Sequence, residues 1–373
     1  IASLQARLDK LNAETARRKE IARQAAIRAA NTYAMPANGS VVATAAGRGL
    51  IQVAQGAASL AQAISDAIAV LGRVLASAPS VMAVGFASLT YSSRTAEQWQ
   101  DQTPDSVRYA LGMDAAKLGL PPSVNLNAVA KASGTVDLPM RLTNEARGNT
   151  TTLSVVSTDG VSVPKAVPVR MAAYNATTGL YEVTVPSTTA EAPPLILTWT
   201  PASPPGNQNP SSTTPVVPKP VPVYEGVTLT PLKTEPESYP GVLLDLNDLI
   251  VIFPADSGVK PVYVMLSSPL DSGIFTRRQL QKKFDSHKYD FGLGEKSANN
   301  GTLAEFRDKI LEHLADPATV EKGTYHSEVK SKVHYNARTN IVVIIGEDGM
   351  FVSGWRIEPG TDQYNFYMKN EVL

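Results

Sequence analysis

The sequence predicts a protein of several domains: an N-terminal helical hairpin or coiled-coil region, a central β-rich domain, and a small C-terminal α+β domain with an antiparallel sheet. Its length of 373 residues corresponds to two or three ordinary domains. The composition also changes along the chain, from Ala-rich runs to short β-type runs and then to a mixture of both patterns. We therefore expect three regions, at residues 1–104, 105–266 and 267–373.

The first region begins with the clearest helical pattern in the chain, over residues 1–34. Its apolar stripe consists of Leu4, Leu8, Leu11 and Ile21. Basic residues outnumber acidic ones here, which is typical of a solvated helix face, or alternatively of an arm that meets acidic lipid or a receptor. Because the sequence starts inside this pattern and without Met, we expect a longer protein with a further N-terminal module.

Residues 41–89 are rich in Ala, Val, Ile and Leu, but their pattern does not predict a membrane span. Polar side chains such as Asp66 and Arg73 interrupt the run before it reaches the roughly 18 apolar residues that a span requires. We expect a soluble helix that pairs with the first one and that Pro79 ends or kinks. One or two short helices around Trp99 and Tyr109 are expected to follow.

The central region contains short β-type runs that Gly, Pro, Asn and Thr separate. They lie at residues 136–142, 151–156, 167–174, 181–185 and 195–199. This pattern predicts an antiparallel β sandwich or a related β domain. Residues 201–222 are dense in Pro, Ser, Thr and Asn, so we expect a flexible or polyproline-like excursion there.

The C-terminal region mixes helical and strand patterns. Helices are predicted at 275–284 and 303–314, the second with Thr302 as N-cap and Glu305 completing a capping box. Four strands are predicted, at residues 332–335, 340–345, 351–357 and 364–368. The sequence therefore predicts two helices that lead onto an antiparallel sheet of four strands.

The overall composition limits the chemistry that the chain can perform. The formal net charge is +0, so a globally basic nucleic-acid-binding protein is not indicated, and phosphate binding has to depend on local clusters. The chain has no cysteine, which excludes disulfides, thiol catalysis and zinc sites with cysteine ligands. No carboxylate cluster with the pattern of a Mg²⁺ site is evident, so we expect neither a metal nor another cofactor.

One basic run in the C-terminal region surrounds a histidine, His287. The cations around it are Arg277, Arg278, Lys282, Lys283 and Lys288. An imidazole exchanges protons near neutral pH, and the cations attract a phosphodiester. Further along, Phe351, Ser353 and Trp355 alternate on one face of a predicted strand, which places a hydroxyl beside a stacking surface. A base, a phosphate cradle, a hydroxyl and an aromatic ring together indicate metal-independent RNA cleavage, although a basic run is often only a solvated helix face.

Several separated motifs in this region resemble the cytotoxic domain of colicin D. They are QKKF…H…DFG, LAEFRDKILEHLADPATVEKGTY (Leu303–Tyr325), SKVHYN (Ser331–Asn336), NIVVI (Asn340–Ile344) and FVSGWRI (Phe351–Ile357). The resemblance implies a nuclease that cuts the anticodon loop of arginine tRNAs. Upstream, LYEVTVP, LTWTP and FPADSG…PVYVM are similar to the translocation domain of S-type pyocins. That second resemblance implies a role in carrying the toxic domain into a target bacterium.

We expect a mechanism in which the 2′-OH of the RNA attacks the adjacent phosphodiester. In this mechanism His287 transfers the proton, Lys283 or Lys282 stabilises charge on the phosphate, Ser353 binds a phosphate oxygen, and Trp355 stacks on a nucleotide. The products are a 2′,3′-cyclic phosphate and a 5′-OH end.

The sequence departs from the colicin D pattern next to the histidine. The family has a lysine immediately before it, whereas Asp285 and Ser286 intervene here, with one extra residue. The choice between Lys282 and Lys283 stays open, and Lys288 is a further candidate.

Other basic and imidazole groups of the region have weaker assignments. A second cluster, Lys322, Lys330, Lys332 and Arg338, is expected to bind RNA phosphates, above all through Lys330 and Lys332. We expect His313 to be structural because it lies on a predicted helix. His326 and His334 are the alternative bases, since each lies near lysines.

The two resemblances imply several binding partners. We expect a tRNA substrate, an acidic immunity protein on the C-terminal domain, and an outer-membrane receptor with import machinery in the target cell. The toxin would be released from its producer and would act in the cytoplasm of the target bacterium. The alternatives are a bacteriocin with a different nuclease activity, or a non-enzymatic bacterial surface or adhesion protein.

Overall fold

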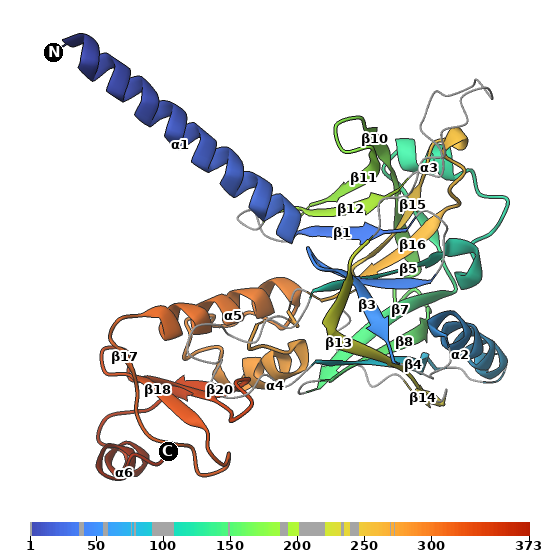
Figure 1. Cartoon of the computed structure of the whole chain (residues 1–373). Coiled ribbons are helices and arrows are strands. Elements are labelled where there is room, and N and C mark those ends of the chain that lie inside the picture. The colour runs from blue at the N-terminus through green and yellow to red at the C-terminus, as the bar shows by residue number, and fades with distance from the viewer. Residues whose placement is uncertain are drawn as a thin grey trace.

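The computed structural model describes residues 2–36, 41–54, 59–75, 77, 80–91, 108–147, 150–186, 193–200, 221–232, 235–238, 246–268, 270–271 and 273–373. These residues form a long N-terminal helix, a β domain built on two sheets, and a C-terminal α+β domain beside it (Figure 1). The helix expected around Trp99 and nearly all of the excursion 201–222 lie outside the described residues.

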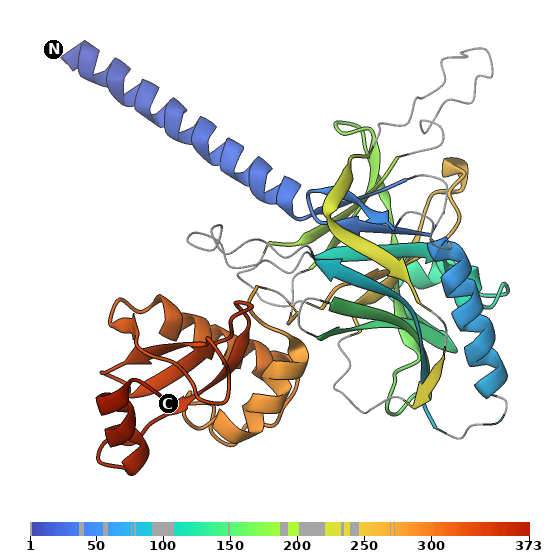
Figure 2. The same cartoon turned by 60° about the horizontal axis from the view of Figure 1, so that its bottom comes forward.

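The first helix, α1 (Ala2–Ala30), projects from the rest of the chain as a single rod (Figures 1 and 2). Leu11 and Ile21 are 61% and 59% exposed, so no described element covers this part of the apolar stripe. The expected pairing with a second helix is not found among the described residues. No helix in the described part of the chain is both long and apolar enough to span a membrane.

Residues 41–89 form strands around one helix rather than the single long helix that we expected. β2 (Val42–Ala45), β3 (Gly49–Val53) and β4 (Met82–Tyr91) join the large sheet, and α2 (Leu60–Leu75) is the helical part. Ala-rich composition favoured a helix locally. The strand partners that overrode this preference lie far away in the sequence, so a local pattern could not reveal them.

Within the described residues, the large sheet contains 12 strands and crosses the boundary expected at residue 104. Its order is β6-β9-β15-β16-β5-β2-β3-β13-β4-β8-β7, with β14 paired to β4. Its other strands are β5 (Tyr109–Asp114), β6 (Thr135–Asp137), β7 (Met140–Arg147), β8 (Thr150–Ser157), β9 (Ala166–Met171), β13 (Val223–Pro231), β14 (Pro236–Ser238), β15 (Asp248–Ile252) and β16 (Val262–Leu266). Tyr109 therefore begins a strand, not the short helix that we expected.

A second sheet of four strands packs on one face of the large sheet, in the order β1-β12-β11-β10. Its strands are β1 (Thr32–Met35), β10 (Ala173–Asn175), β11 (Leu180–Val185) and β12 (Leu195–Trp199). Between the sheets, Trp199 meets Phe253 edge to face, with ring centroids 5.2 Å apart. The predicted β sandwich is present, but it is not purely antiparallel, because β1 pairs with β12 in parallel, as β3 does with β13.

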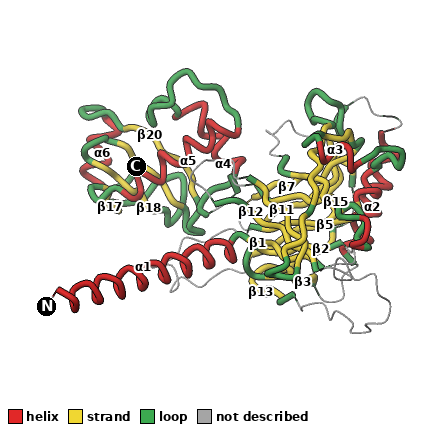
Figure 3. The backbone as a smooth tube through the Cα atoms, turned by 90° about the horizontal axis from the view of Figure 1, so that it is seen from above, coloured by secondary structure: helices red, strands yellow, loops and turns green. Residues whose placement is uncertain are grey.

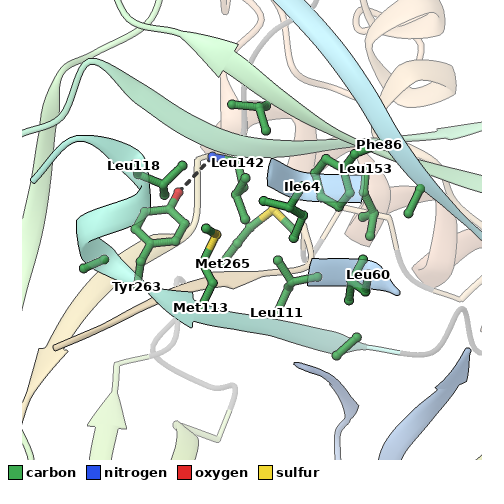
Figure 4. Close-up of a cluster of buried hydrophobic side chains, with 14 of the residues drawn as sticks. Leu60, Ile64, Phe86, Leu111, Met113, Leu118, Leu142, Leu153, Tyr263 and Met265 are labelled. Carbon is green, nitrogen blue, oxygen red and sulfur yellow. Dashed lines mark hydrogen bonds between the residues drawn. The ribbon is translucent and has the colours of Figure 1, made fainter. Parts of the chain in front are cut away.

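The opposite face of the large sheet carries a second core, which α2 covers (Figure 4). The sheet curls, so that β7 at its end comes close to β15 and β16. Arg141 of β7 forms a buried ion pair with Asp248 of β15. The hydroxyl of Tyr263, on β16, accepts a hydrogen bond from the Leu142 N–H at 3.0 Å. These contacts fix the strand against which the C-terminal domain rests.

The C-terminal domain has three layers, with helices on both faces of a four-stranded antiparallel sheet. The strands, in the order in which they pair, are β17 (Thr319–Glu321), β18 (Lys332–Asn336), β19 (Ile341–Ile345) and β20 (Phe351–Arg356). On one face, α4 (Arg277–His287) and α5 (Asn300–Ala315) bury Phe284 and Phe306 against the sheet. On the other face, α6 (Asp362–Asn370) buries Tyr367. Figure 3 shows this unit beside the β domain.

Two predictions for this domain need correction. Residues 364–368 lie in α6 rather than in a strand, because spacing of about one helical turn lets Tyr364, Tyr367 and Met368 pack together on the sheet. The fourth strand is β17 instead. The N-cap of α5 is Asn299, and the capping box is closed by the Thr302 side chain rather than by Glu305.

Candidate active site

The helix α4 carries the candidate base, His287, as its last residue. Thr276 caps the other end by accepting a hydrogen bond from a first-turn backbone N–H at 3.1 Å. Leu280 and Phe284 are buried and anchor one side of the helix. Lys283 precedes His287 by four residues, so the two side chains lie on the same side of α4.

The imidazole of His287 lies between an aromatic ring and a carboxylate, and its side chain is 21% exposed. The ring of Trp355 stacks on it, with centroids 5.8 Å apart and planes inclined by 25°. The Oδ2 atom of Asp290 lies 3.6 Å from Nδ1. Burial lowers the pKa of His287 below its usual value, Asp290 opposes this shift, and Lys283 adds to it. A lowered pKa keeps the imidazole neutral at pH 7, which is the form that accepts a proton.

The three candidate lysines differ in what surrounds them. Lys283 is half-buried. Its pKa is lowered mainly by this burial and further by repulsion from the charge of Lys282. Lys282 is exposed. The Nζ of Lys288 donates to the Lys296 carbonyl at 3.0 Å and lies 5.6 Å from the centre of the Phe284 ring, so this side chain is already held. Lys283 therefore has the environment that best fits a group beside the base.

A bulge in β20 changes the arrangement that the alternating pattern predicted. Ile344 pairs with Ser353, but the next residue, Ile345, pairs with Phe351, so one residue of β20 is extra. Phe351 packs in the core beneath α4 and α5, whereas Trp355 packs against the core beneath α6. The prediction that Phe351, Ser353 and Trp355 share one face is wrong, because a bulge reverses the alternation.

Ser353 is almost completely buried, with 2% of its surface exposed. Within the described residues its hydroxyl has no hydrogen-bond partner. Such a buried hydroxyl is uncommon, because leaving it unpaired costs free energy. Its role as a phosphate ligand stays a proposal.

Two predicted RNA-binding residues, Arg277 and Arg278, contact the β domain. Arg277 is 2% exposed, and its Nη2 donates to the Asn144 carbonyl in β7 at 2.9 Å. Arg278 forms an ion pair with Glu145 in the same strand. In this arrangement Arg277 is occupied by the β domain and is not open to RNA, and Arg278 is engaged beside it.

Two further predicted RNA-binding residues, Lys330 and Lys332, lie at the surface in ion pairs. The Nζ of Lys330 is 2.6 Å from Glu347, and that of Lys332 is 3.1 Å from Glu321. Exposed pairs of this kind contribute little stability, so either carboxylate is readily exchanged for a phosphate. Their assignment stays a prediction.

The remaining histidines occupy three different environments. His313 is buried on α5, and its Nε2 lies 3.0 Å from the His334 carbonyl oxygen, which agrees with the structural role that we expected. Burial lowers the pKa of His334, on β18. His326 is exposed, with Nδ1 2.6 Å from the Leu373 carbonyl oxygen.

Sequence reasoning missed two residues, one that contacts Trp355 and one that lies close to His287. Tyr325 meets Trp355 edge to face with centroids 5.7 Å apart, and no local pattern signals this contact because the two residues belong to distant segments. Asp290 follows His287 by three residues, a spacing that brings side chains together at a helix end. That spacing was a usable signal. Among the described residues no group of three or more His, Cys, Asp or Glu side chains is arranged to hold a metal ion.

Two segments of the chain, one central and one C-terminal, match known protein families. Residues 126–265 match the S-type pyocin family, and residues 279–367 match the colicin D family. Pyocin-S2 of Pseudomonas aeruginosa is 93% identical over 271 residues, which are 73% of this chain and 39% of that protein. Colicin-D of Escherichia coli is 35% identical over 309 residues, which are 79% of this chain and 42% of that protein. The chain thus spans about two fifths of these relatives.

Two solved structures are similar to parts of the chain. A ribonuclease from Escherichia coli in complex with its inhibitor protein is 48% identical, covers 26% of this chain and 100% of its own, and has a TM-score of 0.25. The translocation domain of ColE7 is 20% identical over 77% of this chain and 99% of its own, with a TM-score of 0.39. From the family matches, residues 126–265 belong to the S-type pyocin family, and residues 279–367 belong to the colicin D family.

Proposed function

We propose that the chain is part of a bacteriocin whose C-terminal domain cleaves tRNA, in the anticodon loop of arginine tRNAs, inside a target bacterium. The observation that carries this proposal is the setting of His287: half-buried, beside Lys283 and Trp355, in a domain of the colicin D family. A neutral imidazole beside a cation and a stacking ring suits proton transfer from a ribose hydroxyl next to a bound phosphate.

The reaction is a transesterification within the RNA. His287 accepts the proton of the 2′-OH, and the 2′ oxygen then forms a bond to phosphorus while the bond from phosphorus to the 5′ oxygen breaks. The leaving oxygen takes up a proton, which gives a 2′,3′-cyclic phosphate and a 5′-OH end. The ammonium group of Lys283 stabilises the charge that develops on the phosphate oxygens. Trp355 stacks on a nucleotide, and Ser353 donates a hydrogen bond to a phosphate oxygen.

The β domain serves delivery in this proposal. Residues 126–265 match the S-type pyocin family. Motifs in and near this segment resemble the translocation domain of that family, which is why we expect a role in import. An outer-membrane receptor and import machinery of the target cell are therefore proposed partners. The toxin leaves the producing cell and acts in the cytoplasm of the target.

An acidic immunity protein is the proposed partner that protects the producer. Lys282 and Lys283 lie on α4 shortly before His287, and cations that bind phosphates also bind carboxylates. Reversing both charges, by Lys282→Glu with Lys283→Glu, slows association and weakens its salt dependence. Binding kinetics at two salt concentrations measure this, and equal association rates for parent and variant would refute the proposed surface.

The function is tested by incubating the full chain with total bacterial tRNA in the presence of EDTA. We expect discrete tRNA fragments with 2′,3′-cyclic phosphate ends, and no cleavage of duplex DNA in a parallel reaction. Activity that EDTA abolishes and Mg²⁺ or Zn²⁺ restores would overturn the metal-independent mechanism. Cleavage of DNA but not tRNA would favour a different nuclease, and an inert chain would favour a surface or adhesion protein.

A further inference from the structure

We propose that Asp290 is a positioning residue that holds the Nδ1 side of His287 and thereby presents Nε2 to the RNA. This inference rests on the proposed function. It starts from the turn that follows α4. The Asp290 N–H donates to the His287 carbonyl at 3.0 Å, and the Leu293 N–H donates to the Lys288 carbonyl at 2.8 Å. Phe291 and Leu293 are buried and anchor the turn on the domain core.

The turn brings the carboxylate of Asp290 to one nitrogen of the imidazole. Oδ2 lies 3.6 Å from Nδ1, which is longer than a direct hydrogen bond but within reach of one after a small ring rotation. Trp355 covers a face of the same ring. Nδ1 of His287 faces Asp290, and Trp355 stacks on one face of the imidazole ring. Nε2 is therefore the nitrogen that is available to take a proton from a substrate.

The charges around His287 act in opposite directions. Lys283, one turn earlier on α4, disfavours the protonated imidazole, and Asp290 favours it. Trp355, from β20, adds no charge. Asp285 is also close in sequence, but its side chain is 73% exposed and lies 4.0 Å from Lys288. Asp290 is therefore the carboxylate that stabilises the imidazolium formed when His287 accepts the 2′-OH proton.

This arrangement predicts the effect of Asp290→Asn on the full chain. Loss of the carboxylate lowers the pKa of His287 further, so the pH at which cleavage rises to half its maximum shifts downward. The rate at neutral pH falls roughly 10- to 100-fold, the loss that is typical when a side chain that orients a metal-bound histidine is removed. Asp290→Glu restores part of the rate. Asp285→Asn is the matched control, because it removes the same charge two residues from His287, and we expect the parent rate and pH profile.

The proton NMR titration of His287 provides a readout that does not depend on catalysis. We expect its pKa to fall in Asp290→Asn and to stay at the parent value in Asp285→Asn. If the parent cleaves tRNA and Asp290→Asn leaves both the rate and the pH profile unchanged, the positioning role is refuted while the proposed function stands. If the parent does not cleave tRNA, the proposed function fails, and an unchanged titration in Asp290→Asn would still refute the contact.

Discussion

At the scale of single residues, two buried serines of the C-terminal domain differ in whether their hydroxyl groups have a partner. Ser331 is 2% exposed, and its Oγ accepts a hydrogen bond from the Tyr325 N–H at 2.9 Å. Ser353 is equally buried, and its Oγ has no partner within the described residues. A buried hydroxyl without a protein partner does not stabilise the fold, and a bound ligand would supply the hydrogen bond that it lacks.

Replacing each serine by alanine separates stability from function. Ser353→Ala should leave the melting temperature of the C-terminal domain close to that of the parent and should lower the tRNA cleavage rate. Ser331→Ala should cost about 1 kcal/mol of stability, because it leaves the Tyr325 N–H unsatisfied. Thermal melts and cleavage assays on both variants check this. An active Ser353→Ala variant would remove Ser353 from the site.

Residue types and local spacing were sufficient to propose His287 and its neighbouring lysines as site residues, and these roles stay a prediction. Local sequence could not predict that Arg277 is buried, because its side chain contacts Asn144, which lies more than a hundred residues earlier in the chain. It also failed for Phe351, because a single bulge in β20 moves its side chain to the other face of the sheet. Such errors arise wherever a distant contact or an extra residue alters a regular pattern.

At the scale of elements, one glycine joins the sheet of the C-terminal domain to the end of α6. Gly323 has φ +75°, a conformation that favours glycine, and an added Cβ would lie 1.8 Å from the Glu371 carbonyl oxygen. The Thr324 N–H donates to that same oxygen at 2.9 Å. The close approach is what lets the chain end pair with the segment before β18.

Gly323→Ala should therefore destabilise the C-terminal domain in two ways, through backbone strain and through a clash between the added Cβ and the Glu371 carbonyl oxygen. Gly360 is the matched control, since its φ is +89° and nothing lies within 4 Å of an added Cβ. We expect Gly360→Ala to cost on the order of 1 kcal/mol, the cost of the left-handed conformation, and Gly323→Ala to cost several. Urea unfolding of the domain measures both. Equal costs would show that the contact with Glu371 is easily relaxed.

The elements that could be predicted are those whose partners are close in sequence. The amphipathic pattern of α5 and the strands β18, β19 and β20 were confirmed, because α5 buries one face and the strands are neighbours joined by short turns. The N-terminal hairpin was not confirmed. β2 and β4 pair with β5 and β8 across large stretches of sequence, and composition carries no information about such partners.

At the scale of the whole molecule, the C-terminal domain rests on the outermost strand of the large sheet, β7. Arg277 and Arg278 make this contact through Asn144 and Glu145. The contact is incomplete, because Nε and Nη1 of Arg277 are buried and have no partner within the described residues. An incompletely satisfied buried cation weakens an interface, so we expect the two domains to separate at modest cost.

A charge swap tests whether the pair between Arg278 and Glu145 holds the domains together. Arg278→Glu should increase their separation, because it places two carboxylates side by side. Arg278→Glu combined with Glu145→Arg should restore the parent distance. The chain contains no cysteine, so one introduced cysteine in each domain permits spin labelling and a distance measurement. Unchanged distances in Arg278→Glu would show that the ion pair does not hold the interface.

The assignment of His287 as the general base can be tested directly. Cleavage of tRNA by the full chain is compared among the parent, His287→Ala, His326→Ala and His334→Ala, with thermal melts to confirm folding. We expect His287→Ala to lose roughly 10²- to 10⁴-fold in rate, the usual contribution of a general base, while its fold stays intact and the other two variants cleave close to the parent rate. A His287→Ala variant that cleaves tRNA at nearly the parent rate, while His326→Ala or His334→Ala does not, would contradict the assignment.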